Sequence, residues 1–404
     1  LSRAIECTAE ALLDVKDCEV CLCGAYSAKA FTGASEYTNE SKSLPRSRLS
    51  SPSLRARLGG CASDAFQKTA NKWAQKKGTG FLRRLADKTI TLTDANKDLI
   101  SPKDLRTAQI YNAQYLGVPS WLRHSAGHLK FVSTVHDLIP IKFPHALPTE
   151  IIKPFFESID GIDPRDHVIC VSEHTKMDLC EYRRDLDPAR VSVAYLGASD
   201  SFKPSSDPEI QAHVRAKYSI PSGPFLLAVG TLAPHKNFAR LIESFGALIQ
   251  EQHIGDLNLV ISGSSGWKNE QMQEALSRRK FLAQRIVFTG FVSDADLPGL
   301  YGSALAFVFP SIYEGFGLPV LEAMQCGVPV VCTNTSSVPE VAGDAALYFD
   351  PLSADEISNA MLTIYRDGIL RKSLAEKAIK RAATFNWNRC ASQTVASYKQ
   401  ALDE

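Results

Sequence analysis

The sequence predicts an α/β protein of two doubly wound domains, and three observations favour this fold class. A chain of 404 residues exceeds what one hydrophobic core usually supports, so two domains of roughly 200 residues are expected. Short apolar runs alternate with helical patterns, which is typical of parallel strands buried on both faces. The composition changes to that of a linker at residues 200–208. We therefore expect domains at residues 1–200 and 201–384, followed by a last helix.

The first domain is expected to open with a helix over residues 1–13, whose apolar side chains repeat at helical spacing. Because a helix opens the chain at Leu1, the pattern favours a first strand and loop ahead of the sequence as given. Residues 41–60 are rich in Ser, Arg, Pro and Gly, which predicts a loop. Strands are expected at residues 19–23, 89–93, 129–140, 167–172 and 190–197.

The second domain has a cleaner alternation of strands and helices. Strands are expected at residues 225–231, 257–263, 285–290, 305–311, 329–335 and 346–350. Helices are expected at residues 237–250, 268–280, 294–304 and 318–326, and an amphipathic helix follows residue 385. Ligands of doubly wound sheets bind outside the carboxyl ends of the strands. Lys236, Gly263 and Glu314 each follow a strand, so we expect them to line one crevice.

Two glutamates flank a Gly-Phe-Gly turn in "YEGFGLPVLEAMQCGVPVV", residues 313–331. The two glycines oppose a continuous helix, so Glu314 is expected in the turn. A helix is expected to begin near Leu318, with Pro319 at its first position, where a missing N–H costs nothing. Glu322 would then lie in the first turn of this helix.

The free amides of Phe316, Gly317 and Leu318 would point out of that helix N-terminus, which makes an anion site. Two carboxylates beside an anion site would repel the anion. They are better placed to accept hydrogen bonds from hydroxyl groups of the same ligand. The stretch therefore predicts a ligand in which a polyol is joined to a phosphate.

The net charge of the chain is +1, but a basic segment, residues 42–88, holds twelve Lys and Arg against two Asp, a local charge of +10. A solvated face, a nucleic-acid surface and a contact with an anionic membrane or lipid-linked acceptor are the alternatives. Each basic residue near an anionic leaflet is worth about 1 kcal/mol, so half of them would hold a peripheral protein. The aromatic residues Phe66, Trp73 and Phe81 are too sparse for base stacking. We therefore favour contact with an anionic membrane or a lipid-linked acceptor, and expect no nucleic acid.

Ten cysteines are scattered along the chain rather than set in a framework. Cys18, Cys21 and Cys23 include a C-x-x-C spacing, but they lie in a strand-like run with no histidine or second pair nearby. A buried strand is favoured there over a redox or metal site. The sequence has no run of 18 apolar residues and no charged-then-apolar leader. We therefore expect a cytoplasmic protein, peripheral at the inner face of the membrane.

Six motifs together resemble one known family, the retaining, nucleotide-sugar-dependent glycosyltransferases of family four. They cover nearly all of the second half and part of the first from about residue 129, whereas the first 125 residues match loosely. As a linked series in this order they are specific, unlike any one alone. The motifs are "HDLIP" (136–140), "VGTLAPHKN" (229–237), "SGSSGW" (262–267), "VFTGFVSDADLPGLY" (287–301), "PSIYEGFGLPVLEAMQCGVPVV" (310–331) and "NTSSVPEVAGDAALYFDP" (334–351).

The resemblance implies two facing Rossmann-like domains in the arrangement called GT-B, with a cleft between them. It implies that the diphosphate and base of an activated sugar lie against the second domain. The first domain would meet the acceptor, and the last helix, residues 385–404, would pack back on that domain.

The resemblance also assigns roles to charged residues. Lys236 would neutralise the diphosphate, although a solvated lysine is the plain alternative, and a cation at a helix start is disfavoured by the helix dipole. His235 stands where relatives often carry arginine, and it would contact phosphate only when protonated. Glu322 would grip both ribose hydroxyls, whereas the plain reading is an acid favoured by the helix dipole.

Glu314 would sit beside the transferred sugar, accept hydrogen bonds from its hydroxyls and favour positive charge at the anomeric carbon. His136 would contact the donor sugar from the end of a strand, although a lone histidine is more often structural. Asp137 is expected to cap the following turn. Gly263 and Ser264 would let the backbone approach the nucleotide.

Two patterns resemble other sites. Asp294 and Asp296 match the metal-binding D-x-D motif of another glycosyltransferase class. However, the stretch "VSDADLPGLY" is typical of the start of a helix, with an N-cap and an acidic first turn. "SGSSG" lacks the full G-x-G-x-x-G dinucleotide fingerprint. We therefore expect no metal and no cofactor, only a GDP- or UDP-linked donor sugar and a sugar or lipid-linked glycan acceptor.

The predicted function is transfer of a hexose, mannose or glucose, from a nucleoside diphosphate sugar to an acceptor hydroxyl with retained anomeric configuration. Surface polysaccharide, lipopolysaccharide or glycolipid assembly is the expected setting. A nucleotide-sugar epimerase or phosphorylase of the same fold is one alternative. A non-catalytic nucleotide-sugar-binding protein is another, although Lys236, Glu314, Glu322 and His136 together favour an enzyme.

Overall fold

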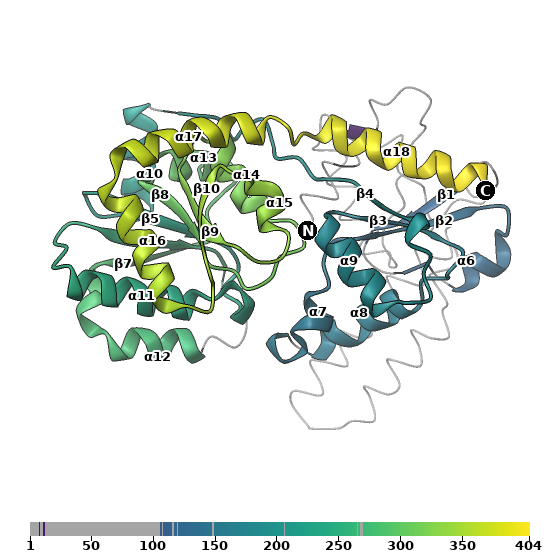
Figure 1. Cartoon of the computed structure of the whole chain (residues 1–404), viewed down its shortest axis with the longest axis horizontal. Coiled ribbons are helices and arrows are strands. Elements are labelled where there is room, and N and C mark those ends of the chain that lie inside the picture. The colour runs from purple at the N-terminus through teal and green to yellow at the C-terminus, as the bar shows by residue number, and fades with distance from the viewer. Residues whose placement is uncertain are drawn as a thin grey trace, which may run out of the picture.

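The computed structural model describes Thr8, Ala11, Leu12 and Arg106, and residues 108–114, 117–118, 120–147, 149–205, 207–264, 266 and 270–404. Within the helix expected at residues 1–13, Thr8, Ala11 and Leu12 are described, and all three are helical and buried. The strands expected at 19–23 and 89–93, the loop at 41–60, the basic segment and Cys18, Cys21 and Cys23 lie outside the described residues. Figure 1 shows two lobes, each with a parallel sheet and covering helices.

The described part of the first lobe holds a parallel sheet in the order β1-β2-β3-β4. Its strands are β1 (Ile110–Ala113), β2 (Lys130–Val135), β3 (His167–Cys170) and β4 (Val191–Val193). Its helices are α6 (Ser120–Ser125), α7 (Ile139–Lys142), α8 (Thr149–Asp160) and α9 (Glu173–Tyr182), with short 3-10 turns η3 (Pro144–Ala146) and η4 (Pro188–Arg190). Strand β1 was not predicted, because its "IYNA" is too short and too polar to form an apolar run.

The second lobe holds a parallel sheet in the order β10-β9-β8-β5-β6-β7. Its strands are β5 (Phe225–Val229), β6 (Asn258–Ser262), β7 (Ile286–Gly290), β8 (Ala306–Phe309), β9 (Val330–Thr333) and β10 (Ala346–Phe349). This is the doubly wound order: β6 and β7 extend the sheet on one side of β5, and β8, β9 and β10 extend it on the other side. The switch point lies between β5 and β8. The crevice at such a switch point is where ligands of this fold bind.

Helices cover both faces of the second sheet. They are α10 (Pro208–Lys217), α11 (Phe238–Glu251), α12 (Glu270–Arg278), α13 (Leu297–Gly302), α14 (Leu318–Gln325), α15 (Val338–Ala342), α16 (Ala354–Arg366) and α17 (Gly368–Ala382), with 3-10 turns η5 (Pro234–Lys236) and η6 (Lys280–Gln284). On β5, Leu226 packs with α11 on one face, while Phe225 and Leu227 belong to the core on the other face. This alternation explains why the strand sequence is apolar at every position.

The last helix, α18 (Trp387–Asp403), leaves the second lobe and lies on the first sheet (Figure 1). Ser397 and Ser192 of β4 are joined by a hydrogen bond of 2.9 Å, and the Asn112 amide of β1 donates to the Tyr398 hydroxyl over 2.6 Å. The two sheets lie on either side of the expected boundary at residue 200. Among the described helices, none has the length and hydrophobicity needed to cross a bilayer.

Candidate active site

The switch point of the second sheet is occupied by a lysine–glutamate pair. Lys236 ends the turn η5 that follows β5, and Glu314 lies in the loop that follows β8. The Lys236 Nζ is 2.5 Å from Glu314 Oε1, and the two side chains are 14% and 10% exposed. Strand order therefore brings together two residues that are 78 positions apart in the chain.

The two loops are tied together by their backbones. The carbonyl of His235 accepts hydrogen bonds from the Ile312 N–H (2.8 Å) and the Ser311 hydroxyl (3.2 Å). Asn237 adopts a left-handed conformation with φ 60°, and its amide donates to the Pro310 carbonyl over 3.1 Å. Asparagine tolerates this conformation better than most residues, which accounts for its place after the lysine.

Both members of the pair can form further hydrogen bonds with a ligand. An ammonium has three donors, so Lys236 can keep Glu314 and still donate to a phosphate oxygen. A carboxylate has about four acceptor positions, so Glu314 can keep Lys236 and accept from sugar hydroxyls. The arrangement suits a ligand whose phosphate and hydroxyl groups are neighbours.

The backbone of Glu314 is fixed from within the second lobe. Its N–H donates to the Ser336 hydroxyl over 3.0 Å, and its carbonyl accepts from the Ser337 hydroxyl over 2.9 Å. Both serines precede helix α15. Sequence reasoning included them in a motif but gave them no role, because a serine pair before a helix is also an ordinary capping pattern.

Helix α14 begins at Leu318, as predicted, and its N-cap is Gly317 with φ 103°. Pro319 is at the second helical position rather than the first, where its missing N–H is equally harmless. The N–H groups of Phe316, Gly317 and Leu318 donate no hydrogen bond within the described chain. These amides remain available to an anion.

Glu322 lies in the second turn of α14, so the expectation of a first-turn position was wrong, and the helix-dipole explanation loses its force. The residue is 4% exposed, and one of its oxygens accepts from the buried hydroxyl of Tyr301 over 3.1 Å. Tyr301 had no signal in the sequence, since its partner lies 21 residues away. Its hydroxyl fixes one oxygen of the carboxylate.

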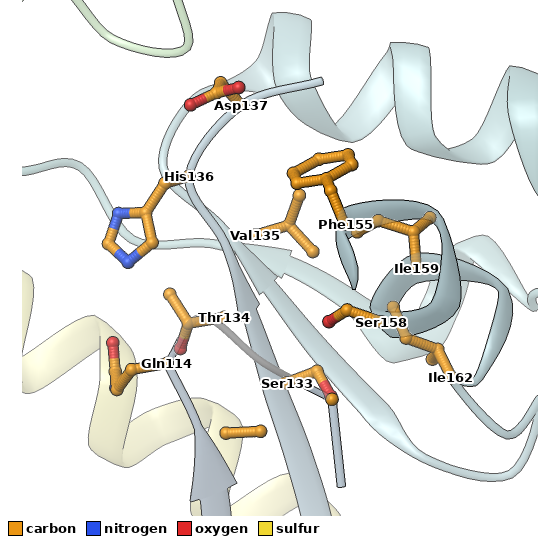
Figure 2. Close-up of a pocket in the computed structure, with 12 residues that line it drawn as sticks. Gln114, Ser133, Thr134, Val135, His136, Asp137, Phe155, Ser158, Ile159 and Ile162 are labelled. Carbon is orange, nitrogen blue, oxygen red and sulfur yellow. The ribbon is translucent and has the colours of Figure 1, made fainter. Parts of the chain in front are cut away.

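His136 follows β2 and lines a pocket at the carboxyl ends of β1 and β2. Burial lowers its pKa to about 4, although a hydrogen bond to the Gln114 backbone partly opposes this, so the imidazole is neutral. Figure 2 shows the ring turned away from Phe155 and Ile159, towards the side of Gln114. Its Nε2 has no hydrogen-bond partner within the described chain. A neutral, buried and unsatisfied ring nitrogen suits contact with a ligand hydroxyl.

The loop of the second lobe meets the first lobe at His136. A Cβ on Gly315 would clash with the His136 carbonyl oxygen, so only glycine fits there. Asp137 accepts from the Ile139 N–H over 2.9 Å, which confirms its predicted capping role. Burial raises the pKa of Asp137, with Glu314 adding to the effect.

The other three residues predicted to contact the donor are His235, Gly263 and Ser264. Burial and the neighbouring Lys236 lower the pKa of His235 to about 4, which disfavours a cationic contact with phosphate. A Cβ on Gly263 would clash with the Gly230 carbonyl, so the glycine serves a backbone contact between two loops. Ser264 is exposed and accepts from the Leu232 N–H over 3.2 Å.

The acids of the D-x-D sequence have structural partners. The carboxylate of Asp296 accepts from Lys217 and the Tyr218 hydroxyl, both over 2.7 Å, and from Ser293 over 2.6 Å. These bonds lower its pKa well below the usual range. The expected acidic first turn was wrong, because α13 begins only at Leu297.

Comparison with known proteins identifies the family. The model of the family described as "Glycosyl transferases group 1" matches residues 211–381. The O-antigen chain mannosyltransferase B of Escherichia coli is 35% identical over 272 residues, which cover 66% of this chain and 70% of that protein. The chain belongs to the glycosyl transferases group 1 family. It is therefore an enzyme that transfers sugar.

One further relative and two solved structures are also similar to this chain. The serotype-specific mannosyltransferase WbdA of Escherichia coli is 28% identical over 68% of this chain, although the match spans only 34% of WbdA. A glycosyltransferase structure from Rickettsia africae has a TM-score of 0.60 at 20% identity, covering 80% of this chain and 88% of that chain. WaaG, a glycosyltransferase involved in lipopolysaccharide biosynthesis, has a TM-score of 0.58 at 17% identity, covering 76% and 81%. These structures confirm the predicted fold of two facing α/β domains.

Proposed function

We propose that this protein transfers a hexose, mannose first among the candidates, from a nucleoside diphosphate sugar to a hydroxyl of a glycan acceptor, with retention of configuration. The observation that carries the proposal is the Lys236–Glu314 pair at the switch point of the second sheet. A cation, free helix amides and an acid converge there, which suits a phosphate joined to a sugar. The names of the mannosyltransferase relatives support mannose and polysaccharide assembly.

The reaction breaks the bond from the anomeric carbon to the diphosphate and forms a bond from that carbon to the acceptor oxygen. We infer attack on the same face, with the acceptor proton passing to the departing phosphate oxygen. Lys236 and the amides before α14 stabilise charge on the leaving diphosphate, and Glu314 stabilises positive charge at the anomeric carbon. These groups supply the neutralisation, so the proposal requires neither a metal nor a cofactor.

The acceptor is assigned to the first lobe. The pocket beside His136 is lined by polar groups of Gln114, Ser133, Thr134 and Ser158 on one sheet end and one helix (Figure 2). Ser133 is 5% exposed, and its hydroxyl has no partner within the described chain. The unsatisfied buried hydroxyl of Ser133 favours a hydroxyl-bearing ligand such as a sugar. Enclosing both substrates between the lobes would exclude water and limit hydrolysis of the donor.

The basic segment keeps its predicted role in this proposal. We infer that residues 42–88 bring the enzyme to an anionic membrane surface or a lipid-linked acceptor on the cytoplasmic side. Their twelve basic residues support this interpretation.

A thermal-shift panel of GDP-, UDP- and ADP-sugars tests donor binding. One of these donors should raise the melting temperature, because a ligand at 100 times its Kd stabilises by about 2.7 kcal/mol. With the selected donor and a mannoside acceptor, Glu314→Gln should reduce kcat by about 10²-fold or more. Glu251→Gln on the exposed end of α11 is the matched control and should leave kcat unchanged.

Three results separate the alternatives. Activity of Glu314→Gln within threefold of the parent would refute the role of Glu314. Free or isomerised sugar products without an acceptor requirement would favour an epimerase or phosphorylase. Donor binding without any turnover would favour a binding protein.

A further inference from the structure

Helix α9 of the first lobe contacts the loop that carries Glu314. Figure 1 shows α9 at the side of the first lobe that faces the second lobe. Ser172 is the N-cap residue of α9, and Thr175 and Asp178 are buried residues of the helix. The hydroxyls of Ser172 and Thr175 donate to the Gly315 carbonyl over 2.6 and 3.1 Å. The Tyr313 hydroxyl donates to Asp178 Oδ2 over 2.5 Å.

These contacts lie on both sides of Glu314 in the chain. Residue 313 is held by its side chain and residue 315 by its carbonyl, both from α9. Glu314 itself is held by Ser336 and Ser337 of its own lobe. Three consecutive residues are thus fixed by two lobes, which leaves the Glu314 backbone little freedom to move independently of α9.

The contact to Tyr313 is buried and charge-assisted. Asp178 is 4% exposed and Tyr313 is 5% exposed. Burial raises the pKa of Tyr313, with the bond to Asp178 adding to the effect, so the phenol keeps its proton and donates. Hydrogen bonds with a charged partner are stronger than those between two neutral groups.

Asp178 does not need Tyr313 to be satisfied. Lys142 Nζ is 2.6 Å from its Oδ1, and His174 Nε2 is 3.2 Å from its Oδ2. The rings of Phe143 and His174 pack at 5.8 and 5.6 Å from the Tyr313 ring, so a phenylalanine would fill the same space. The hydroxyl therefore adds a directional link between the lobes rather than neutralising a charge that would otherwise be unpaired.

We propose that Asp178 is a positioning residue for the reaction, which acts through Tyr313 to set the carboxylate of Glu314 against the donor sugar. The carboxylate of the second lobe is then placed correctly only when α9 of the first lobe is docked on its loop. The inference rests on the proposed function, since it gives Glu314 a role in transfer.

The test compares Tyr313→Phe with Tyr182→Phe. Tyr182 lies on the same helix and donates to Asp160 over 2.9 Å within the first lobe, so its variant loses the same kind of bond away from the interface. The probes are GDP-mannose, or UDP-glucose if the panel selects it, with release of the nucleoside diphosphate as the readout. Tyr313→Phe should lower kcat at least tenfold, with the Kd of the nucleoside diphosphate within twofold of the parent. Tyr182→Phe should change neither quantity. Asp178→Asn supplies a second variant with the same expected direction.

A double-variant cycle separates positioning from general damage. If Tyr313 acts through Glu314, the Tyr313→Phe, Glu314→Gln double variant should be no slower than Glu314→Gln alone. Loss that multiplies in the double variant, or a kcat of Tyr313→Phe within twofold of the parent, would overturn the inference. Equal loss in Tyr182→Phe would overturn it as well. A fall for Glu314→Gln without one for Tyr313→Phe refutes only the inference, whereas no fall for Glu314→Gln refutes the proposed function.

Discussion

Lys236 and Glu314 neutralise each other in the structure described here, and both remain able to bind further groups. The lysine should therefore contribute to donor affinity through its remaining N–H groups. The sequence already placed each residue after a strand. It could not reveal that they are paired, because pairing depends on the order of strands across the sheet.

Replacement of the lysine tests its phosphate contact. Lys236→Ala should raise the Kd of the nucleoside diphosphate by roughly 10- to 100-fold, since a charge-assisted contact is worth about 1.5–3 kcal/mol. Isothermal titration calorimetry gives this Kd directly. Lys217→Ala is the matched control, because Lys217 pairs with Asp296 over 2.7 Å at another carboxylate. An unchanged Kd for Lys236→Ala would contradict the assignment.

Residues whose role depends on a distant partner were the ones that sequence reasoning missed. Tyr301 fixes Glu322, and Ser336 and Ser337 fix Glu314, through contacts made only after folding. None of them carries a local pattern that separates it from a core tyrosine or a capping serine. The charged residues were predictable because acids in a glycine turn and a lysine at a helix start are locally unfavourable and require an explanation.

The site depends on two loops, one after β5 and one after β8. The loop after β8 packs against the first lobe at Gly315. The strands of the second sheet were predicted well, because all but a few of their residues are apolar and each run is bounded by turns. The start of α13 was placed too early, because Asp296 pairs with Lys217 rather than opening a helical turn. The short strand β1 gave no apolar signal.

Adding one methyl group at Gly315 tests the packing of this loop against the first lobe. Gly315→Ala would place a Cβ against the His136 carbonyl, and the loop must move to avoid the clash. We expect kcat/KM to fall by about 10²-fold, because displacement of about 1 Å at a reacting group has effects of that size. Gly127→Ala is the control, since a Cβ there meets nothing within 4 Å. Steady-state kinetics of both variants would decide, and equal activity would show that the loop tolerates the change.

Helix α18 and the contacts of α9 join the two lobes. The stability of the whole molecule therefore depends in part on side chains that are buried where the loops of the two lobes meet. His235 is one of these, at 7% exposure and with its Nδ1 unpartnered within the described chain. Its pKa is about 4 in the folded protein and near 6.5 when unperturbed. Between these values the unfolded chain binds more protons, so the free energy of unfolding rises with pH in this window.

This linkage predicts a pH dependence of stability. On going from pH 7.5 to pH 5, the parent should lose about 2 kcal/mol of unfolding free energy that His235→Gln retains, because the variant has no imidazole to protonate. Urea unfolding of both proteins at the two pH values measures the difference. An identical pH dependence for parent and variant would mean that the imidazole titrates normally in the folded state.

In the proposed function, the site beside Lys236 and Glu314 receives a nucleoside diphosphate sugar. A crystal structure of the complex with the donor selected by the panel tests it most directly. We expect a β-phosphate oxygen within hydrogen-bond distance of Lys236 Nζ, the ribose hydroxyls on Glu322, and the sugar ring beside Glu314 and His136. A donor bound elsewhere, with these side chains untouched, would contradict it.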